Sequence, residues 1–165
     1  GNSSQITDGG AALLVTTEKR AQKLGLEPLG TIEGHTFAGL PPKRMGLGPS
    51  YATSLLLDRT GVGMADIGLI EMNEAFAAVV IANEMVFADD GLSEHFLGRK
   101  AVGAIDRGLL NVNGGAVAVG HPVGSSGTRI LLTLLLEMRR RSVDLGLATL
   151  CVGGGQGASV LLRRP

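Results

Sequence analysis

A glycine-rich stretch around one histidine constrains this chain more than any other feature. Residues 111–127 read NVNGGAVAVGHPVGSSG, with five glycines and with His121 near the middle. Glycine packs nothing and costs conformational entropy, so several occur together where the backbone must turn or approach another group closely. Ser125 and Ser126 are predicted to cap an apolar helix over residues 128–138. The stretch therefore predicts an imidazole in a tight loop beside a helix N-terminus, where negative charge is favoured.

The bulk composition excludes several classes of protein. A length of 165 residues, 44% of them hydrophobic, predicts one domain over residues 1–165 with a real core. Fifteen basic and fifteen acidic residues give no net charge, which argues against nucleic-acid binding. The single cysteine excludes an internal disulfide and fits a reducing, cytoplasmic compartment. No apolar run reaches the roughly 18 residues needed to span a bilayer. The opening GNSS, without Met, predicts a chain that starts inside a longer protein.

Strands and helices are predicted to alternate along the chain. Apolar runs predict strands at residues 11–15, 28–37, 69–72, 145–152 and 158–162, and helical patterns occur at residues 18–24, 50–59, 75–87, 91–97 and 128–138. Alternation of this kind predicts an α/β fold with a mostly parallel sheet. The tight glycine turn at residues 153–157 predicts that the last two strands pair antiparallel, which makes the sheet mixed.

Two of the predicted helices are too apolar for this chain alone. The helices at residues 75–87 and 128–138 carry apolar side chains on nearly every face, and a sheet covers only one face of each. Each large side chain left in water would forgo about 1.5–3 kcal/mol. We therefore expect a second half of the protein or another subunit to pack there. The alternative is that the chain's own loops cover these helices.

Three side chains could carry chemistry, and each also has an ordinary structural interpretation. Cys151 ends a predicted strand before a glycine turn, where a thiol acts as an acid or base or is merely a small apolar residue. His121 could be a base or a structural loop residue. Asn73 follows a strand and could hold a bound water or cap the next helix. The glycine patterns lack the helix and acidic residue of a dinucleotide site and the lysine of a P-loop, and we expect no metal site.

Three motifs together resemble the C-terminal half of the thiolase family. They are NEAFA at residues 73–77, NVNGGAVAVGHPVGSSGTR at residues 111–129 and CVGGGQG at residues 151–157. The opening GNSSQITDGGAA and the MGLGP loop resemble the same family in the same order. The resemblance implies half of a thiolase-like fold, a five-stranded mixed sheet with helices on both faces and the last strand antiparallel. It also implies acyl transfer: thiolytic cleavage of 3-ketoacyl-CoA in fatty acid β-oxidation, or Claisen condensation of two acyl-CoA molecules.

The resemblance assigns roles residue by residue. It implies that His121 activates the nucleophilic cysteine and donates to the enolate oxygen, and that Asn73 holds the water that completes that oxyanion site. Cys151 would be the acid/base, and the Gly153 N–H would contribute to a second oxyanion hole. The residues that would contact the pantetheine arm or the substrate pocket are Ser4, Met45, Ala75 and Phe76. Coenzyme A would be a substrate, and no resident cofactor is expected.

One essential part of a thiolase is missing from this sequence. The family's nucleophilic cysteine lies in the N-terminal half, and this chain has only Cys151. The resemblance therefore implies a chain that is inactive alone, needs an N-terminal thiolase half as its partner and forms a homo-oligomer in the intact protein. Two alternatives remain open. One is a non-catalytic acyl-CoA or lipid-carrier relative, and the other is a decarboxylating condensing enzyme, which would carry His or Asn in place of Cys151.

Overall fold

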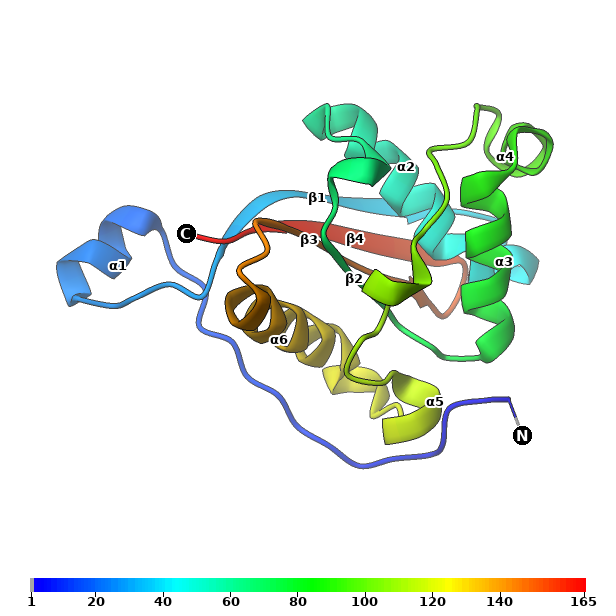
Figure 1. The fold of residues 1–165 in the computed structure, drawn as a ribbon. Coiled ribbons are helices and arrows are strands. Elements are labelled where there is room, and N and C mark those ends of the chain that lie inside the picture. Colours follow the sequence, from blue (N-terminus) through cyan, green and yellow to red (C-terminus); the bar gives the residue numbers. More distant parts are fainter. Residues whose placement is uncertain (1) are drawn as a thin grey trace.

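Four strands form one mixed sheet in the order β1-β4-β3-β2 (Figure 1). The computed structural model describes residues 2–165. The strands are β1 (Thr31–Gly39), β2 (Leu69–Met72), β3 (Leu145–Val152) and β4 (Gln156–Arg163). Strand β4 runs antiparallel to both β1 and β3, whereas β2 runs parallel to β3. The mixed sheet is as predicted, and β2 and β3 have the predicted bounds.

Helices lie on both faces of this sheet. The α-helices are α1 (Glu18–Leu24), α2 (Gly48–Thr60), α3 (Ala77–Ala88), α4 (Asp90–Leu97), α5 (Ala116–Val119) and α6 (Val123–Arg141), and the short 3₁₀ helices are η1 (Pro42–Leu47), η2 (Met64–Asp66) and η3 (Arg107–Leu109). Helices α2 and α3 lie on one side of the sheet, and α5 and α6 lie on the other (Figure 1). Helix α1 projects from the body of the molecule.

The period-two alternation of β3 and β4 builds a separate core on each face. Leu147 and Leu161 are fully buried in a cluster with Leu56 of α2. Their neighbours Ala148 and Leu162 belong to the opposite cluster, which contains Leu134 and other residues of α6. Because successive side chains of a strand point to opposite faces, two adjacent apolar positions supply two cores. The sheet is therefore buried on both faces, and its strand ends are held firmly.

The expected fifth strand is absent from residues 2–165, and the five-stranded prediction is wrong in that respect. Residues 11–15 are not a strand, and Leu14 and Val15 remain 79% and 72% exposed. The edge beyond β2 carries only an isolated parallel bridge between Ile70 and Leu110. An apolar run shows that a segment is suited to a strand, but a strand forms only where a hydrogen-bonding partner lies beside it. Residues 2–16 instead run past α5 and α6 (Figure 1).

Apolar side chains remain exposed on both helices that were expected to need a partner. On α3, Ile81 and Met85 are 50% and 54% exposed, one helical turn apart on the same face. On α6, the face turned away from the sheet includes Leu136, which is 42% exposed. The chain's own loops do not cover these positions.

No helix in the described part of the chain is both long and apolar enough to cross a membrane.

Candidate active site

His121 lies in the short loop between α5 and α6, fixed by contacts to the N-terminal segment. Its backbone N–H donates to the Oγ1 atom of Thr7 at 3.2 Å. The preceding Gly120 has φ = +89°, a region that side chains rarely adopt, and a Cβ atom there would collide with Thr7. Glycine is therefore required at this position for two reasons. The loop presents the imidazole at a fixed place and angle.

Both ring nitrogens of His121 have neighbours. Nδ1 lies 2.7 Å from the Oγ atom of Ser126, and Nε2 lies 3.4 Å from the Nδ2 atom of Asn73. Ser126 Oγ also lies 3.2 Å from the Pro122 carbonyl oxygen and can donate to it. In that arrangement Nδ1–H donates to Ser126, and Nε2 is left as an acceptor facing the amide N–H of Asn73. The ring is therefore prepared to accept a proton at Nε2.

The electrostatic surroundings keep His121 neutral. Partial burial of the ring, followed by the nearby Arg129 guanidinium, lowers the pKa of His121 below its ordinary value. Both effects penalise the imidazolium. A histidine with a lowered pKa is unprotonated near neutral pH, and this is the state in which it can act as a base.

Asn73 directly follows β2 and links the end of that strand to β3. Its backbone N–H donates to the Thr149 carbonyl of β3 at 3.0 Å, which continues the parallel pairing of β2 with β3. Its side chain is 2% exposed, and the Oδ1 atom has no hydrogen-bond partner. Helix α3 begins after Phe76, so Asn73 is not its cap. A buried amide oxygen without a partner is costly unless a water or ligand occupies the site.

Glu74 and Asn111 hold the loop that carries Asn73. The Asn111 side chain accepts from the Met72 N–H at 2.8 Å and donates to the Met72 carbonyl at 2.9 Å. It also donates to Glu74, whose second carboxylate oxygen accepts from the Val117 N–H of α5 at 3.0 Å. These bonds tie the end of β2 to α5, directly before His121. The motifs contain Glu74, Asn111 and Val117, but the sequence did not indicate that these residues form one network.

Cys151 lies near the end of β3, two residues beyond Thr149, whose carbonyl accepts from the Asn73 N–H. It is 8% exposed, and burial raises the pKa of its thiol, so the thiol is protonated at neutral pH. The backbone around it is unusually close. A Cβ atom on Gly48 would lie 3.1 Å from the Cys151 Cα and 2.9 Å from the Gly157 Cα. Gly48 lies within the MGLGP loop, but its contact with Cys151 could not be predicted because it joins residues far apart in the chain.

The remaining predicted residues lie in three places: beside the NEAFA motif, near the pocket and in the turn between β3 and β4. Ser4 donates both its backbone N–H and its hydroxyl to the Ala75 carbonyl, at 3.1 and 3.0 Å, which fastens the N-terminal segment beside the NEAFA motif. Phe76 is 47% exposed and lines a pocket, and Met45 is half-buried in η1. Gly153 lies in the exposed turn between β3 and β4, with open space where a Cβ would be.

One local prediction is wrong. Ser125 and Ser126 do not cap α6, because the helix starts earlier and Pro122 occupies the cap position. Both hydroxyls instead lie within the first turn and bond to the Pro122 carbonyl.

Among residues 2–165, no group of three or more His, Cys, Asp and Glu side chains is arranged to hold a metal ion.

The fold and site define an α/β protein with a neutral imidazole, an amide and a protonated thiol near the ends of two parallel strands. Residues 26–164 match the family model described as "Thiolase, C-terminal domain". The chain is 47% identical over 163 residues to a 3-ketoacyl-CoA thiolase of Aliivibrio fischeri, covering 98% of this chain and 37% of that protein. A 3-ketoacyl-CoA thiolase of Pectobacterium carotovorum is 48% identical over the same shares. The chain therefore belongs to the thiolase family, as its C-terminal domain.

Solved structures of thiolases share this fold. The acetyl-CoA acetyltransferase of Bacillus anthracis superposes with a TM-score of 0.86 at 38% identity, covering 99% of this chain and 38% of that chain. Human mitochondrial 3-ketoacyl-CoA thiolase in complex with CoA gives a TM-score of 0.77 at 37% identity, covering 90% of this chain and 34% of that chain. This chain spans little more than a third of the length of the relatives it matches.

Proposed function

We propose that this chain supplies the acid/base and oxyanion groups of an acyl-CoA C-acyltransferase of the β-oxidation type. It would act with an N-terminal thiolase half that carries the nucleophilic cysteine. The two halves together form the assembled enzyme. The substrates are 3-ketoacyl-CoA and CoA, and no further cofactor takes part. The observation that carries the proposal is the environment of His121, whose Nδ1 is engaged by Ser126 while Nε2 faces Asn73.

In the first step of thiolysis, His121 would remove the proton of the nucleophilic thiol. The thiolate attacks the 3-keto carbon, and the bond between the α- and β-carbons breaks. The electron pair of that bond becomes the enolate of acetyl-CoA. The protonated His121 and a water held by Asn73 donate to the enolate oxygen, which is the kind of charge that preorganised donors stabilise. The buried Oδ1 atom of Asn73, which lacks a partner, supports a bound water at this place.

Cys151 would then deliver its proton to the α-carbon, and acetyl-CoA leaves. In the second step the resulting Cys151 thiolate takes the proton of an incoming CoA thiol, whose sulfur attacks the acyl-enzyme thioester. The bond between the acyl group and the nucleophilic cysteine then breaks, the shortened acyl-CoA leaves, and the cysteine thiolate takes back the proton held by His121. The Gly153 N–H would stabilise the oxyanion of that step. The raised pKa of Cys151 supports this role, because an acid must hold its proton until the carbanion forms. Run in reverse, the same steps give Claisen condensation.

The exposed apolar faces of α3 and α6 support the need for a partner. Ile81, Met85 and Leu136 would be covered in the assembled enzyme by the N-terminal half or by another copy in a homo-oligomer. The single cysteine fits a cytoplasmic location. In isolation the chain would not cleave 3-ketoacyl-CoA, since it has no nucleophilic cysteine besides the acid/base.

The test is release of acetyl-CoA from a 3-ketoacyl-CoA by the assembled enzyme and by its His121→Ala and Cys151→Ala variants. Both substitutions should lower kcat by about 10²–10⁴-fold, the usual contribution of a positioned acid or base. An exposed substitution of the same size, His95→Ala on α4, serves as the control. Full activity of the Cys151→Ala variant would show that the thiol is not the acid, and would favour a non-catalytic acyl-CoA or lipid-carrier role for its surroundings.

A further inference from the structure

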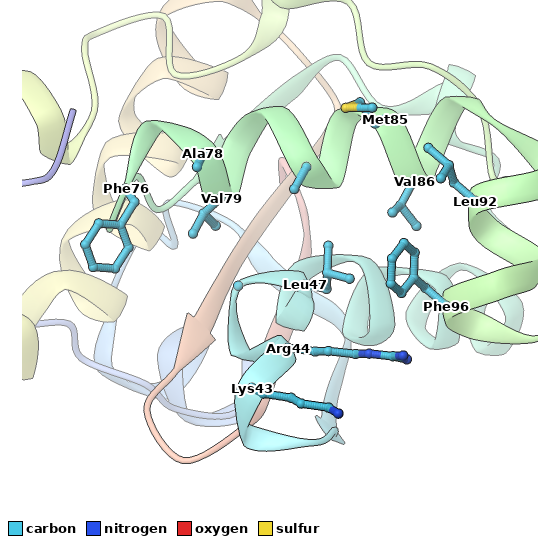
Figure 2. Close-up of a pocket in the computed structure, with 12 residues that line it drawn as sticks. Lys43, Arg44, Leu47, Phe76, Ala78, Val79, Met85, Val86, Leu92 and Phe96 are labelled. Atoms are coloured by element: carbon cyan, nitrogen blue, oxygen red, sulfur yellow. The ribbon is translucent and has the colours of Figure 1, made fainter.

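An apolar groove of about 430 Å³ lies between η1, α3 and α4 (Figure 2). Its volume falls within the range of roughly 300–1,000 Å³ that is typical of small-molecule pockets. Most of the side chains that line it are hydrophobic, and they include Leu47, Val79, Ala82, Val86, Leu92 and Phe96. No acidic side chain lies among the lining residues that the structure describes. The groove therefore suits an uncharged apolar ligand.

Both walls of the groove begin at the candidate active site. The α3 wall starts with Phe76, three residues after Asn73. The η1 wall ends with Leu47, and the next residue, Gly48, packs against the backbone of Cys151. From Phe76 to Met85 the helical rise is about 13 Å. The groove thus leads from the reacting groups towards α4, with Leu92 and Phe96 at the end opposite Phe76 (Figure 2).

Buried hydrogen bonds hold the walls in place. The Asn83 amide, which is fully buried on α3, donates to the Gly46 carbonyl of η1 at 2.7 Å and accepts from the Ser50 N–H at 2.8 Å. The hydroxyl of Tyr51 donates to the Phe96 carbonyl of α4 at 2.5 Å. Because every wall is tied to α2 or to its start, the groove is preformed and needs no rearrangement to accept a ligand.

The two cations on the η1 wall mark the open rim. The Arg44 guanidinium carbon lies 5.1 Å from the centroid of the Phe96 ring, a cation–π distance. Lys43 lies beside it and extends in the same direction (Figure 2). Their aliphatic stems can extend the apolar wall while the charged ends stay in water. The stems of Lys43 and Arg44 can therefore contact an apolar ligand, and the ligand does not need a negative charge to bind.

We propose that this groove binds the fatty acyl chain of the 3-ketoacyl substrate, and that its far end at Leu92 and Phe96 limits the chain length accepted. The inference rests on the proposed thiolase function and adds to it the class of substrate, namely acyl chains that extend well beyond the reacting carbons. The reacting carbonyl lies near Asn73 and Cys151, and the tail passes Phe76 and follows α3. Continuity with the site distinguishes the groove from the outward-facing position Ile81 of α3, whereas Met85 lies at the border and also lines the groove.

The test compares two substrates on the assembled enzyme, 3-ketohexanoyl-CoA and 3-ketohexadecanoyl-CoA. Leu92→Trp fills the far end of the groove, and it should lower kcat/KM for the long substrate about tenfold or more while the short substrate stays within about twofold. Ala82→Leu narrows the groove nearer to Phe76, so it should also discriminate against the long substrate. Leu55→Trp, at a half-exposed position on α2 outside the groove, is the matched control and should change neither value.

Equal losses on both substrates, or no change on either, would overturn the groove as the acyl site and would indicate a surface covered by protein. Ala82→Leu is a small substitution that guards against misfolding of Leu92→Trp. If the unsubstituted assembled enzyme cleaves 3-ketohexanoyl-CoA, the proposed function stands whatever the groove variants do. If it cleaves neither substrate, the thiolase proposal itself fails, and the groove proposal fails with it.

Discussion

The hydroxyl of Ser126 lies 2.7 Å from Nδ1 of His121 and is itself fully buried in the first turn of α6. Ser126 follows His121 by five positions, and the Gly120–Pro122 loop folds the ring back over the helix start. The contact decides which ring nitrogen is free, because Ser126 can donate to the Pro122 carbonyl and accept from Nδ1–H. The orientation and tautomer of the candidate base therefore depend on a residue that would not itself contact substrate.

Replacing Ser126 by alanine should impair catalysis more than binding. The ring would lose the partner that fixes its angle, and a small misplacement of a reacting group costs up to about a hundredfold in rate. We expect kcat of the assembled enzyme to fall about ten- to a hundredfold with little change in KM. The neighbouring Ser125→Ala is the control, since the Ser125 hydroxyl donates to the Pro122 carbonyl and makes no hydrogen bond to the imidazole. A Ser126→Ala enzyme with the full kcat would show that the contact is merely structural.

Glu71 should make the chain less stable as the pH rises. It is 5% exposed, and burial, followed by repulsion from Glu74, raises its pKa from 4.5 to about 7. The folded state therefore holds a proton between pH 4.5 and 7 that the unfolded state has lost. The free energy of unfolding should fall through this window by about 3 kcal/mol, an order-of-magnitude value. Chemical unfolding of the chain at several pH values measures it.

Glu71→Gln provides the matching test, because the amide keeps the shape and cannot ionise. The variant should lack the decrease between pH 4.5 and 7 and should be the more stable protein above pH 7. Glu94→Gln on the exposed side of α4 should keep the decrease. Glu137 has the opposite effect on stability, because its hydrogen bonds to Arg140 lower its pKa to about 2. Its contribution to the free energy of unfolding is therefore lost as the pH falls from 4.5 towards 2. An unchanged pH profile in Glu71→Gln would contradict the role given to burial.

Gly48 should tolerate no side chain. A Cβ atom there would lie 2.5 Å from the Gln156 carbonyl oxygen and 2.9 Å from the Gly157 Cα, and backbone atoms of this kind cannot move aside. Gly48→Ala should lower the free energy of unfolding by about 1–3 kcal/mol, as overpacking does. Gly124→Ala is a control of opposite sign. It lies in α6 with nothing within 4 Å of the new atom, so alanine should stabilise the isolated chain by about 0.5–1 kcal/mol. Equal urea midpoints for both variants would refute the packing argument.

The sequence predicted the parts of the fold that depend on local pattern. β2 and β3 were predicted with correct bounds because their apolar runs stop sharply at polar or glycine residues, and α1 because Gly25 ends it with a left-handed cap. The run at residues 11–15 has the same local character but no strand beside it in this chain. Pattern alone therefore could not decide whether it pairs.

For the site, the motifs indicated His121, Asn73 and Cys151 as candidates, and the structure places Nδ2 of Asn73 3.4 Å from Nε2 of His121. What the sequence could not supply are contacts made across the fold. Gly48 packs on Cys151 over more than a hundred residues of chain, and the apparent capping serine Ser126 supports the imidazole instead. Such relationships depend on how elements pack, and no local spacing encodes them.

The thiol of Cys151 should react slowly with alkylating reagents at neutral pH. Burial raises its pKa above the ordinary value of 9.0, so little thiolate is present. Because it is the only cysteine of the chain, the rate of iodoacetamide labelling reports on it alone. The rate should rise with a midpoint above that of the chain unfolded in urea, and stability should fall as the pH passes the unfolded pKa. A midpoint below that of the unfolded chain would mean that the thiol is activated as a nucleophile, and Cys151 could not then be the acid that holds its proton until the enolate forms.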